Sequence, residues 1–152
     1  MTGEKWKNLL ELVGYAAIVA SLVMVAFELR QSTAVSTAQA TFQINTAFDN
    51  SYRARVQDPV LAQLIIDGHA NPESLTELER NQFAAWLRAD MNIAESAWFY
   101  YDKGLIPEGD FDGFKAGMCS RVITNGGRRY WDDEGKYFAA RFRESIEEWC
   151  FR

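Results

Sequence analysis

Few side chains in this sequence could carry out acid–base or metal chemistry, and those few lie far apart. The chain of 152 residues has one histidine, His69, within residues 67–72, whose composition is typical of a surface turn. A single imidazole excludes a multi-histidine metal centre, and the sequence has no Gly-x-Ser-x-Gly, Glu-x-x-His or glycine-rich phosphate-binding motif. We therefore expect a protein that is not an enzyme and that holds no metal or cofactor. The enzyme alternative rests only on Asp90, His69 and Glu95.

The two cysteines, Cys119 and Cys150, can form at most one disulfide and cannot supply a four-thiolate metal site. A bridge would close a loop of roughly 32 residues and contribute about 3.7 kcal/mol in the chain-entropy model. Such a bridge would persist if this part of the chain lies outside the cytoplasm. The alternative is a pair of free, buried thiols.

Asp90 interrupts the apolar face of a helix predicted over residues 76–102. The apolar positions of that face recur at helical spacing and are Phe83, Trp86, Leu87, Ala94, Ala97, Trp98 and Tyr101. A carboxylate that faces a core must be paired, or its pKa must rise. We expect an ion pair with Arg53, Arg55, Arg121 or Arg128, and the alternative is a contact of Asp90 with a ligand or a proton.

Aromatic residues make up 14% of the chain and cluster at residues 98–101, 130–131 and 149–151. Four consecutive aromatic residues cannot all face one core, so one or two of them should be exposed. Exposed Trp and Tyr are favoured at interfaces. We therefore take Trp98, Tyr101 and Trp131, together with Asp90, as candidate contacts with a partner or a ligand.

The elements that position these residues begin with a membrane anchor. Residues 12–27 carry no charge and are bounded by Glu11 and Glu28. Extended to residues 9–29, the stretch spans roughly 31 Å as a helix, which matches a hydrocarbon core of about 30 Å. The eight Leu, Ile, Val and Phe residues within 12–27 favour insertion by about 2.4–4.8 kcal/mol. The alternatives are a central helix of a soluble bundle and a signal peptide, although the nearest small-residue cleavage pattern begins at Ser36.

Charges near this stretch predict its orientation and its contacts. Lys5 and Lys7 precede it and only Arg30 follows closely, which favours a cytoplasmic N-terminus and a helical domain in the periplasm. Glu28 would lie at the hydrocarbon edge, either at headgroup level or against a residue of another protein. Small residues four apart (Ala16 and Ala20, Ala17 and Ser21) would permit self-association of this helix.

The remainder of the chain predicts an all-α fold with a small bundle of about five helices after the transmembrane helix. We expect an anchor over residues 1–30, continuing without a break into a bundle domain over residues 31–152. Later helices are predicted at 59–67 (ended by Gly68), 76–102 (opened by a Thr76/Glu79 capping box and closed by Gly104), 110–124, 128–134 and 136–149. A net charge of -5 with no basic run excludes a nucleic-acid binder.

Motifs over nearly the whole chain resemble those of a largely uncharacterised family of small bacterial proteins with one N-terminal transmembrane helix and an all-helical domain. The motifs that carry the resemblance are residues 11–15, 27–31, 58–68, 75–80, 104–105 and 127–131. Members often have Pro-Gly and a Trp pair where this chain has Gly126-Gly127 and Tyr130-Trp131. The resemblance implies this architecture but no activity. We expect a single-pass protein of a bacterial inner membrane.

These features favour a non-enzymatic accessory or scaffolding subunit. Its partners would be the lipid bilayer and a larger membrane protein complex, of the respiratory or photosynthetic type. The alternative is a membrane-tethered sensor or small-ligand-binding module in which the aromatic cluster and Asp90 line a pocket.

Overall fold

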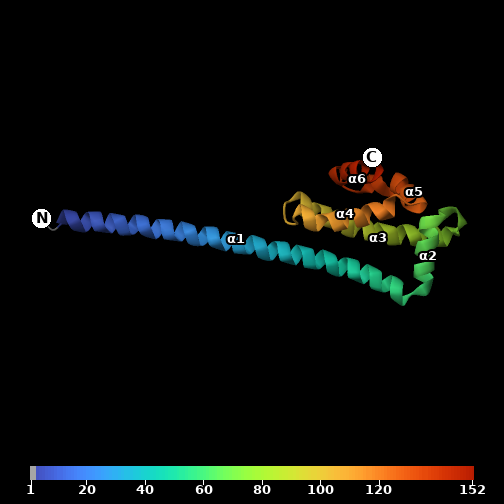
Figure 1. Cartoon of the computed structure of the whole chain (residues 1–152), viewed down its shortest axis with the longest axis horizontal. Helices are drawn as coiled ribbons and strands as arrows, with labels where there is room; N and C mark the ends of the chain where they lie inside the picture. Colours follow the sequence, from blue (N-terminus) through green and yellow to red (C-terminus); the bar gives the residue numbers. More distant parts are fainter. Residues whose placement is uncertain (1–2) are drawn as a thin grey trace. The chain divides into compact units, whose positions relative to one another are not determined.

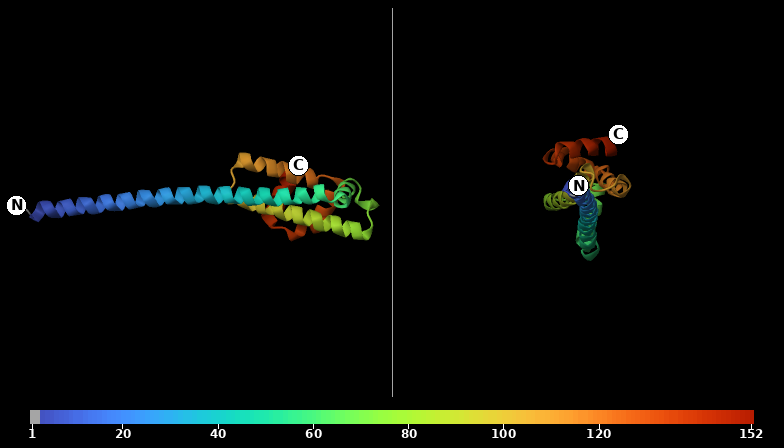
Figure 2. Two further views of the ribbon diagram at one scale, coloured as in Figure 1. Left: turned by 90° about the horizontal axis from the view of Figure 1, so that it is seen from below. Right: turned by 90° about the vertical axis from the view of Figure 1, so that its left-hand side faces the viewer.

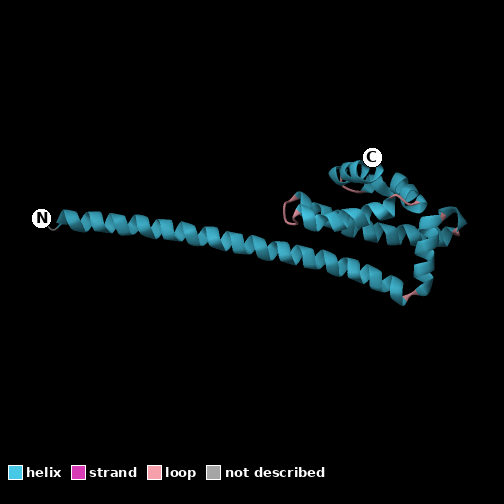
Figure 3. Ribbon diagram, viewed as in Figure 1, coloured by secondary structure: helices cyan, strands magenta, loops and turns pink. Residues whose placement is uncertain are grey.

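The computed structural model of the chain describes residues 3–152, with the side chains at positions 4, 5, 8 and 9 outside the described part. These side chains include that of Lys5, on which the predicted orientation depends, and that of position 9, where the predicted span begins. Residues 3–152 form α-helices joined by short loops and contain no strand, which confirms the all-α prediction (Figures 1 and 3). The α-helices are α1 (Gly3–Gln57), α2 (Pro59–Ala70), α3 (Glu77–Asp102), α4 (Glu108–Val122), α5 (Asn125–Glu134) and α6 (Ala140–Phe151).

Helix α1 is continuous through residue 57, as the lack of Gly and Pro over residues 31–57 predicts. It stops at Asp58, whose Oδ1 accepts hydrogen bonds from the backbone N–H groups of Val60 (2.9 Å) and Leu61 (3.1 Å). Asp58 thereby caps α2, and Pro59 occupies the first turn of that helix, where a missing N–H costs nothing. The chain divides into two compact units, Met1–Ala38 and Gln39–Arg152.

In the first unit, the large apolar side chains of α1 are exposed from Leu10 to Leu29. An 18-residue window of this helix has a mean hydropathy of 2.1, and none of it is buried. By length and composition, α1 therefore contains one stretch near the N-terminus that is able to cross a membrane.

In the second unit, the core forms between the last turns of α1 and helices α3 to α6. Helix α3 packs against α4 and α6, and α4 packs against α5 (Figure 2). Leu87, Val122, Phe142 and Ile146 have no solvent-accessible surface, and Ile44 brings α1 into the same cluster.

The ends of α3 follow the sequence prediction. Thr76 Oγ1 accepts from the backbone N–H of Glu79 (3.3 Å), and the Glu79 carboxylate accepts from the backbone N–H of Thr76 (2.8 Å). Gly104 follows the helix with a positive φ of 69°, which glycine adopts without strain. Both ends are local in sequence, and the capping box and the C-terminal glycine are confirmed.

Other predicted helix limits are wrong, chiefly because three glycines do not break helices. Gly68 lies inside α2, and Gly126 and Gly127 lie in the first turn of α5, all of them buried. A Cβ at Gly126 would overlap the carbonyl of Gly68, one at Gly127 the carbonyl of Arg121, and one at Gly68 the ring of Phe83. Gly68 and Gly126 permit the close approach of α2, α3 and α5, and Gly127 permits that of α5 to the end of α4. Helix α2 extends to Ala70, and α5 begins at Asn125.

The first and last residues of α4 and α6 differ from the predicted ones by a few positions. Helix α4 starts at Glu108 rather than residue 110, directly after Pro107, and ends at Val122 because Thr124 caps α5 instead. The last helix begins at Ala140 rather than residue 136, since Gly135–Tyr137 forms a separate 3-10 turn.

Candidate functional site

A buried ion pair joins α3 and α4 in the second unit. Asp90 is 2% exposed, and its Oδ2 contacts Nε of Arg121 as an ion pair rather than as an aligned hydrogen bond. Ser51 Oγ, from α1, donates a hydrogen bond to Asp90 Oδ1 (3.2 Å). Three helices therefore meet at this carboxylate, and Arg121 is the partner among the four arginines considered from the sequence.

Burial raises the pKa of Asp90, and the Arg121 guanidinium, the Ser51 hydroxyl and Arg55 oppose that rise. Desolvation is the largest of these effects, as expected for a carboxylate placed within a core. A carboxylate held in this way stabilises the association of the helices only as long as its counter-charge stays in place.

Two further donors of Arg121 are engaged. Its NH1 donates to the carbonyl of Gly117 (2.5 Å) and its NH2 to the hydroxyl of Tyr52 (3.3 Å). The guanidinium carbon lies 5.6 Å from the ring centroid of Phe48 and 6.0 Å from that of Tyr52. Arg121 is thus held by an acid, a carbonyl, a hydroxyl and two aromatic rings.

His69 lies in α2 and is partly buried, so its interpretation as a surface residue in a turn is wrong. The ring contacts Phe83 and Trp86 edge-on, with centroids 5.1 and 5.7 Å away. Its Nδ1 lies 2.8 Å from Oγ1 of Thr124.

The tautomer of His69 follows from the bonds of Thr124. The Thr124 hydroxyl donates its one proton to the carbonyl of Arg121 (2.8 Å) and accepts from the backbone N–H of Gly127 (3.0 Å). His69 must therefore donate from Nδ1. Burial, with Arg121 and Arg55 nearby, lowers the pKa of His69 to about 4, so the ring is neutral at physiological pH.

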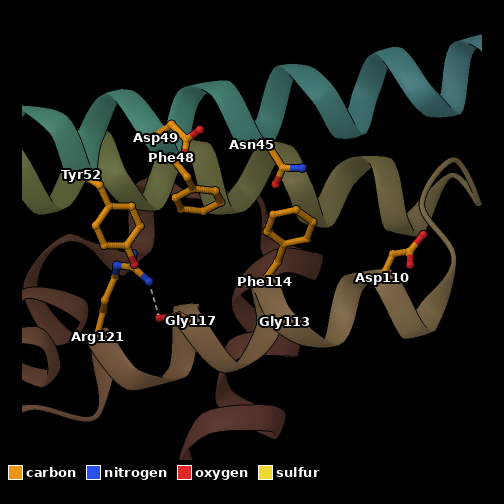
Figure 4. Close-up of a pocket in the computed structure, with 9 residues that line it drawn as sticks. All are labelled: Asn45, Phe48, Asp49, Tyr52, Asp110, Gly113, Phe114, Gly117 and Arg121. Carbon is orange, nitrogen blue, oxygen red and sulfur yellow. Dashed lines mark hydrogen bonds between the residues drawn. The ribbon is translucent and has the colours of Figure 1, made fainter.

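Beside the ion pair, a cleft of about 390 Å³ opens between α1 and α4 (Figure 4). The rings of Phe48 and Phe114 lie between the two helices, with Tyr52 and Arg121 at one end and Asp110 at the other. Asn45, Asp49, Gly113 and Gly117 complete the lining. The sequence interpretation missed this cleft, because its two walls are about 60 positions apart along the chain and neither wall has a motif of its own.

Cys119 of α4 and Cys150 of α6 form a disulfide, with their Cα atoms 4.9 Å apart. Of the two alternatives left open by the sequence, a disulfide or a pair of free thiols, the structure has the disulfide. It ties the helix that carries Arg121 to the C-terminal helix.

The structure gives the candidate aromatic residues internal contacts. Trp98 is 7% exposed and donates from Nε1 to Ser145 Oγ (3.0 Å). Trp131 is 4% exposed and donates from Nε1 to Glu147 (2.7 Å). Tyr101 stacks on Phe111 with centroids 4.2 Å apart. In the run 98–101, the most exposed ring is Phe99, at 49%.

Glu28 lies on α1 with its side chain exposed and forms no ion pair with the described residues. It belongs to the first unit, whereas Asp90, Trp98, Tyr101 and Trp131 belong to the second.

The described residues bring together no cluster of three or more metal-ligating side chains. His69, Asp90 and Glu95, the three groups considered for acid–base chemistry, each have an internal partner, and that of Glu95 is the backbone N–H of Ala139 (2.7 Å). The arrangement can therefore fix three helices and present a cleft.

Comparisons with protein-family models, with curated proteins and with solved structures gave no match to this chain.

Proposed function

We propose that the protein is a non-enzymatic accessory subunit anchored in a membrane by residues 10–29 of α1. The observation that carries the proposal is the exposure of every large apolar side chain in this stretch, including Leu22 at 64% and Phe27 at 69%. Exposure of so many apolar groups is unfavourable in water and favourable in lipid. The alternative of a soluble core helix is disfavoured, because such a helix would be buried.

The orientation proposed is a cytoplasmic N-terminus with the second unit in the periplasm of a bacterial inner membrane. Lys7 before the stretch supports it, as does the disulfide between Cys119 and Cys150, since disulfides persist in oxidising compartments. The family resemblance noted from the sequence supports a single N-terminal transmembrane helix followed by a helical domain.

A role in docking is supported by the character of the two units. The second unit has one hydrophobic core with an ion-paired carboxylate inside it, which is typical of a structural module. The carboxylate of Glu28, without an ion-pair partner in the described chain, would pair with a basic group of a larger membrane complex.

Membrane attachment and orientation are tested with the full chain expressed in a bacterial host. We expect the protein to stay in the membrane fraction after alkaline carbonate extraction. A periplasm-dependent phosphatase fused after Arg152 should be active, whereas a cytoplasm-dependent fluorescent reporter at the same place should be dark. Recovery in the supernatant would contradict the anchor, and the reverse reporter pattern would contradict the orientation.

Docking is tested by purification in a mild detergent from the native membrane, followed by mass spectrometry. We expect a membrane complex to copurify in fixed ratio, and Glu28→Gln to reduce its recovery while Glu11→Gln does not. A chain that runs alone, or only with copies of itself through the small residues of α1, would contradict docking.

A membrane-tethered ligand-binding module is the second candidate, and the cleft between α1 and α4 is the observation that favours it. Its volume falls within the range of about 300–1,000 Å³ typical of small-molecule sites. A thermal-shift screen of the full chain in detergent distinguishes the two, since only a ligand-binding module gains stability with a small molecule.

A further inference from the structure

We propose that the cleft between α1 and α4 binds an organic cation, an ammonium or guanidinium group on a short alkyl chain. The cleft is the one described above, lined by aromatic rings with carboxylates at its rim (Figure 4). This property is separate from anchoring and docking, so it stands or fails independently of them.

The aromatic lining is suited to a positive charge. Phe48 and Phe114 are stacked with centroids 5.8 Å apart and an interplanar angle of 18°. Aromatic faces attract cations within about 6 Å of the ring centre. The chain already uses this attraction at one end of the cleft, where Arg121 lies near Phe48 and Tyr52. No cation of the described residues lies at this range from Phe114.

The charges around the cleft have the matching sign. Asp49 and Asp110 are exposed at its rim, and neither forms an ion pair within the described part of the chain. The positive charge of Arg121 is balanced by Asp90, and Arg121 also donates to Gly117 and Tyr52. A negatively charged ligand would therefore meet two carboxylates and an arginine that is already engaged.

The size and openness of the cleft set the class of ligand. A volume of about 390 Å³ admits a short-chain amine or the end of a lysine or arginine side chain. Asn45 and Tyr52 at the mouth are exposed, so the cation can be free or can be carried by a peptide. The recognised chemistry is the same in both cases.

The test uses the full chain, labelled with ¹⁵N and solubilised in a maltoside detergent that contains no ammonium group. n-Butylammonium is titrated while the backbone amide signals of Gly113 and Gly117, which line the cleft, are followed by NMR. We expect saturable shifts with a dissociation constant of millimolar order, whereas the signal of Gly104, outside the cleft, stays fixed. n-Butanol, a neutral probe of matched size, should bind at least about tenfold more weakly, and butyrate should not bind.

Two pairs of variants test whether n-butylammonium binds in the cleft. Asp49→Asn with Asp110→Asn should weaken n-butylammonium binding at least about fivefold. Asp112→Asn with Asp133→Asn removes the same charge from positions that do not line the cleft and should change binding less than about twofold. Phe114→Leu keeps an apolar side chain and should also weaken binding, because the aromatic face is lost.

A doubly capped lysine distinguishes the source of the cation. Binding comparable to that of n-butylammonium supports a side chain carried by a peptide, and exclusion of the capped lysine supports a free amine. Three results would overturn the proposal: no saturable shift, equal affinity for n-butanol, or equal loss of binding in the two pairs of charge variants.

Discussion

Two stretches of one helix, α1, meet their surroundings in opposite ways. Over residues 10–29 every large apolar side chain is exposed, with Ile18 at 58%. Over residues 39–57 the apolar residues divide by position, so that Ile44 is 3% exposed and Phe42 is 71% exposed. The backbone hydrogen bonding of the two stretches is the same, since both are α-helical.

The difference shows that secondary structure alone does not indicate what stabilises a helix. The stretch over residues 39–57 is stabilised within its own unit. The core of that unit buries Ile44, and Asp90 accepts a hydrogen bond from Ser51. The stretch over residues 10–29 is apolar all round and requires an apolar solvent instead. Four changes test this contrast.

The largest effect is expected from charges in the first stretch. Val19→Arg with Val23→Arg should cost about 5–7 kcal/mol of insertion free energy, which exceeds the favourable contribution of about 2.4–4.8 kcal/mol from the apolar residues. The measurement is the fraction of protein in the carbonate-resistant membrane pellet, which should fall to background.

The matched control places the same charges elsewhere. Val56→Arg with Val60→Arg alters valines that are 83% and 79% exposed outside the apolar stretch. This pair should leave the pellet fraction unchanged. If the first pair also stayed in the pellet, the contrast between the stretches would be lost.

The second-largest effect, a loss of stability, is expected at Asp90, the carboxylate that accepts a hydrogen bond from Ser51 of α1. Asp90→Ala leaves Arg121, whose side chain is 11% exposed, without its counter-charge and should reduce the free energy of unfolding by about 3–5 kcal/mol. Denaturant unfolding in detergent, followed by tryptophan fluorescence, measures the loss. Asp90→Ala with Arg121→Met should recover part of it, and Asp112→Ala, at an exposed site, should change little. A loss below about 1 kcal/mol would contradict the role of the pair.

A single substitution made in both stretches gives the most direct comparison. Ile44→Ala removes a buried side chain and should cost about 2–4 kcal/mol of unfolding free energy. Ile18→Ala, at 58% exposure, should shift the same denaturation curve of the second unit by less than about 0.5 kcal/mol. Equal losses would show that both stretches are packed within the protein.

The smallest effect is a dependence of the free energy of unfolding on pH, and it involves only the second unit. Because the folded-state pKa of His69 is lowered to about 4 from 6.5, folding favours the neutral ring. Its contribution to stability is present above pH 6.5 and declines as the pH falls toward 4. Between pH 7 and pH 5 the full linkage value is about 2 kcal/mol, and partial exposure of the ring reduces the expected loss to about 1 kcal/mol.

The variant His69→Gln isolates this effect, because the chain has no other histidine. It should lose the dependence between pH 7 and pH 5. Asp90 contributes with the opposite sign, since burial raises the pKa of its carboxyl and its protonation on acidification favours the folded state. A variant that keeps the wild-type pH dependence would exclude His69 as its source.

Sequence reasoning succeeded where the physical cause is local. The Thr76/Glu79 cap, the positive φ at Gly104 and the continuity of α1 depend on neighbours a few positions away. The placement of Asp90 in the core followed from helical periodicity, which is also local.

Sequence reasoning failed where a structural feature depends on a contact between distant segments. Glycine serves both in turns and where two backbones meet, and only the fold shows that Gly68 and Gly126 serve the second purpose. Arg121 could not be chosen as the partner of Asp90, since four arginines fitted equally well. The bond of His69 to Thr124 crosses 55 positions and has no sequence pattern of its own.

The close contacts of Gly68, Gly126 and Gly127 have a consequence for relatives of this chain. At Gly126 and Gly127 a Cβ would overlap backbone carbonyls, whereas at Gly68 it would overlap the side chain of Phe83. A relative that retains these helix crossings must therefore keep glycine at 126 and 127, while position 68 can change together with Phe83. A relative with proline in place of Gly126 must hold α2 and α5 farther apart than this chain does.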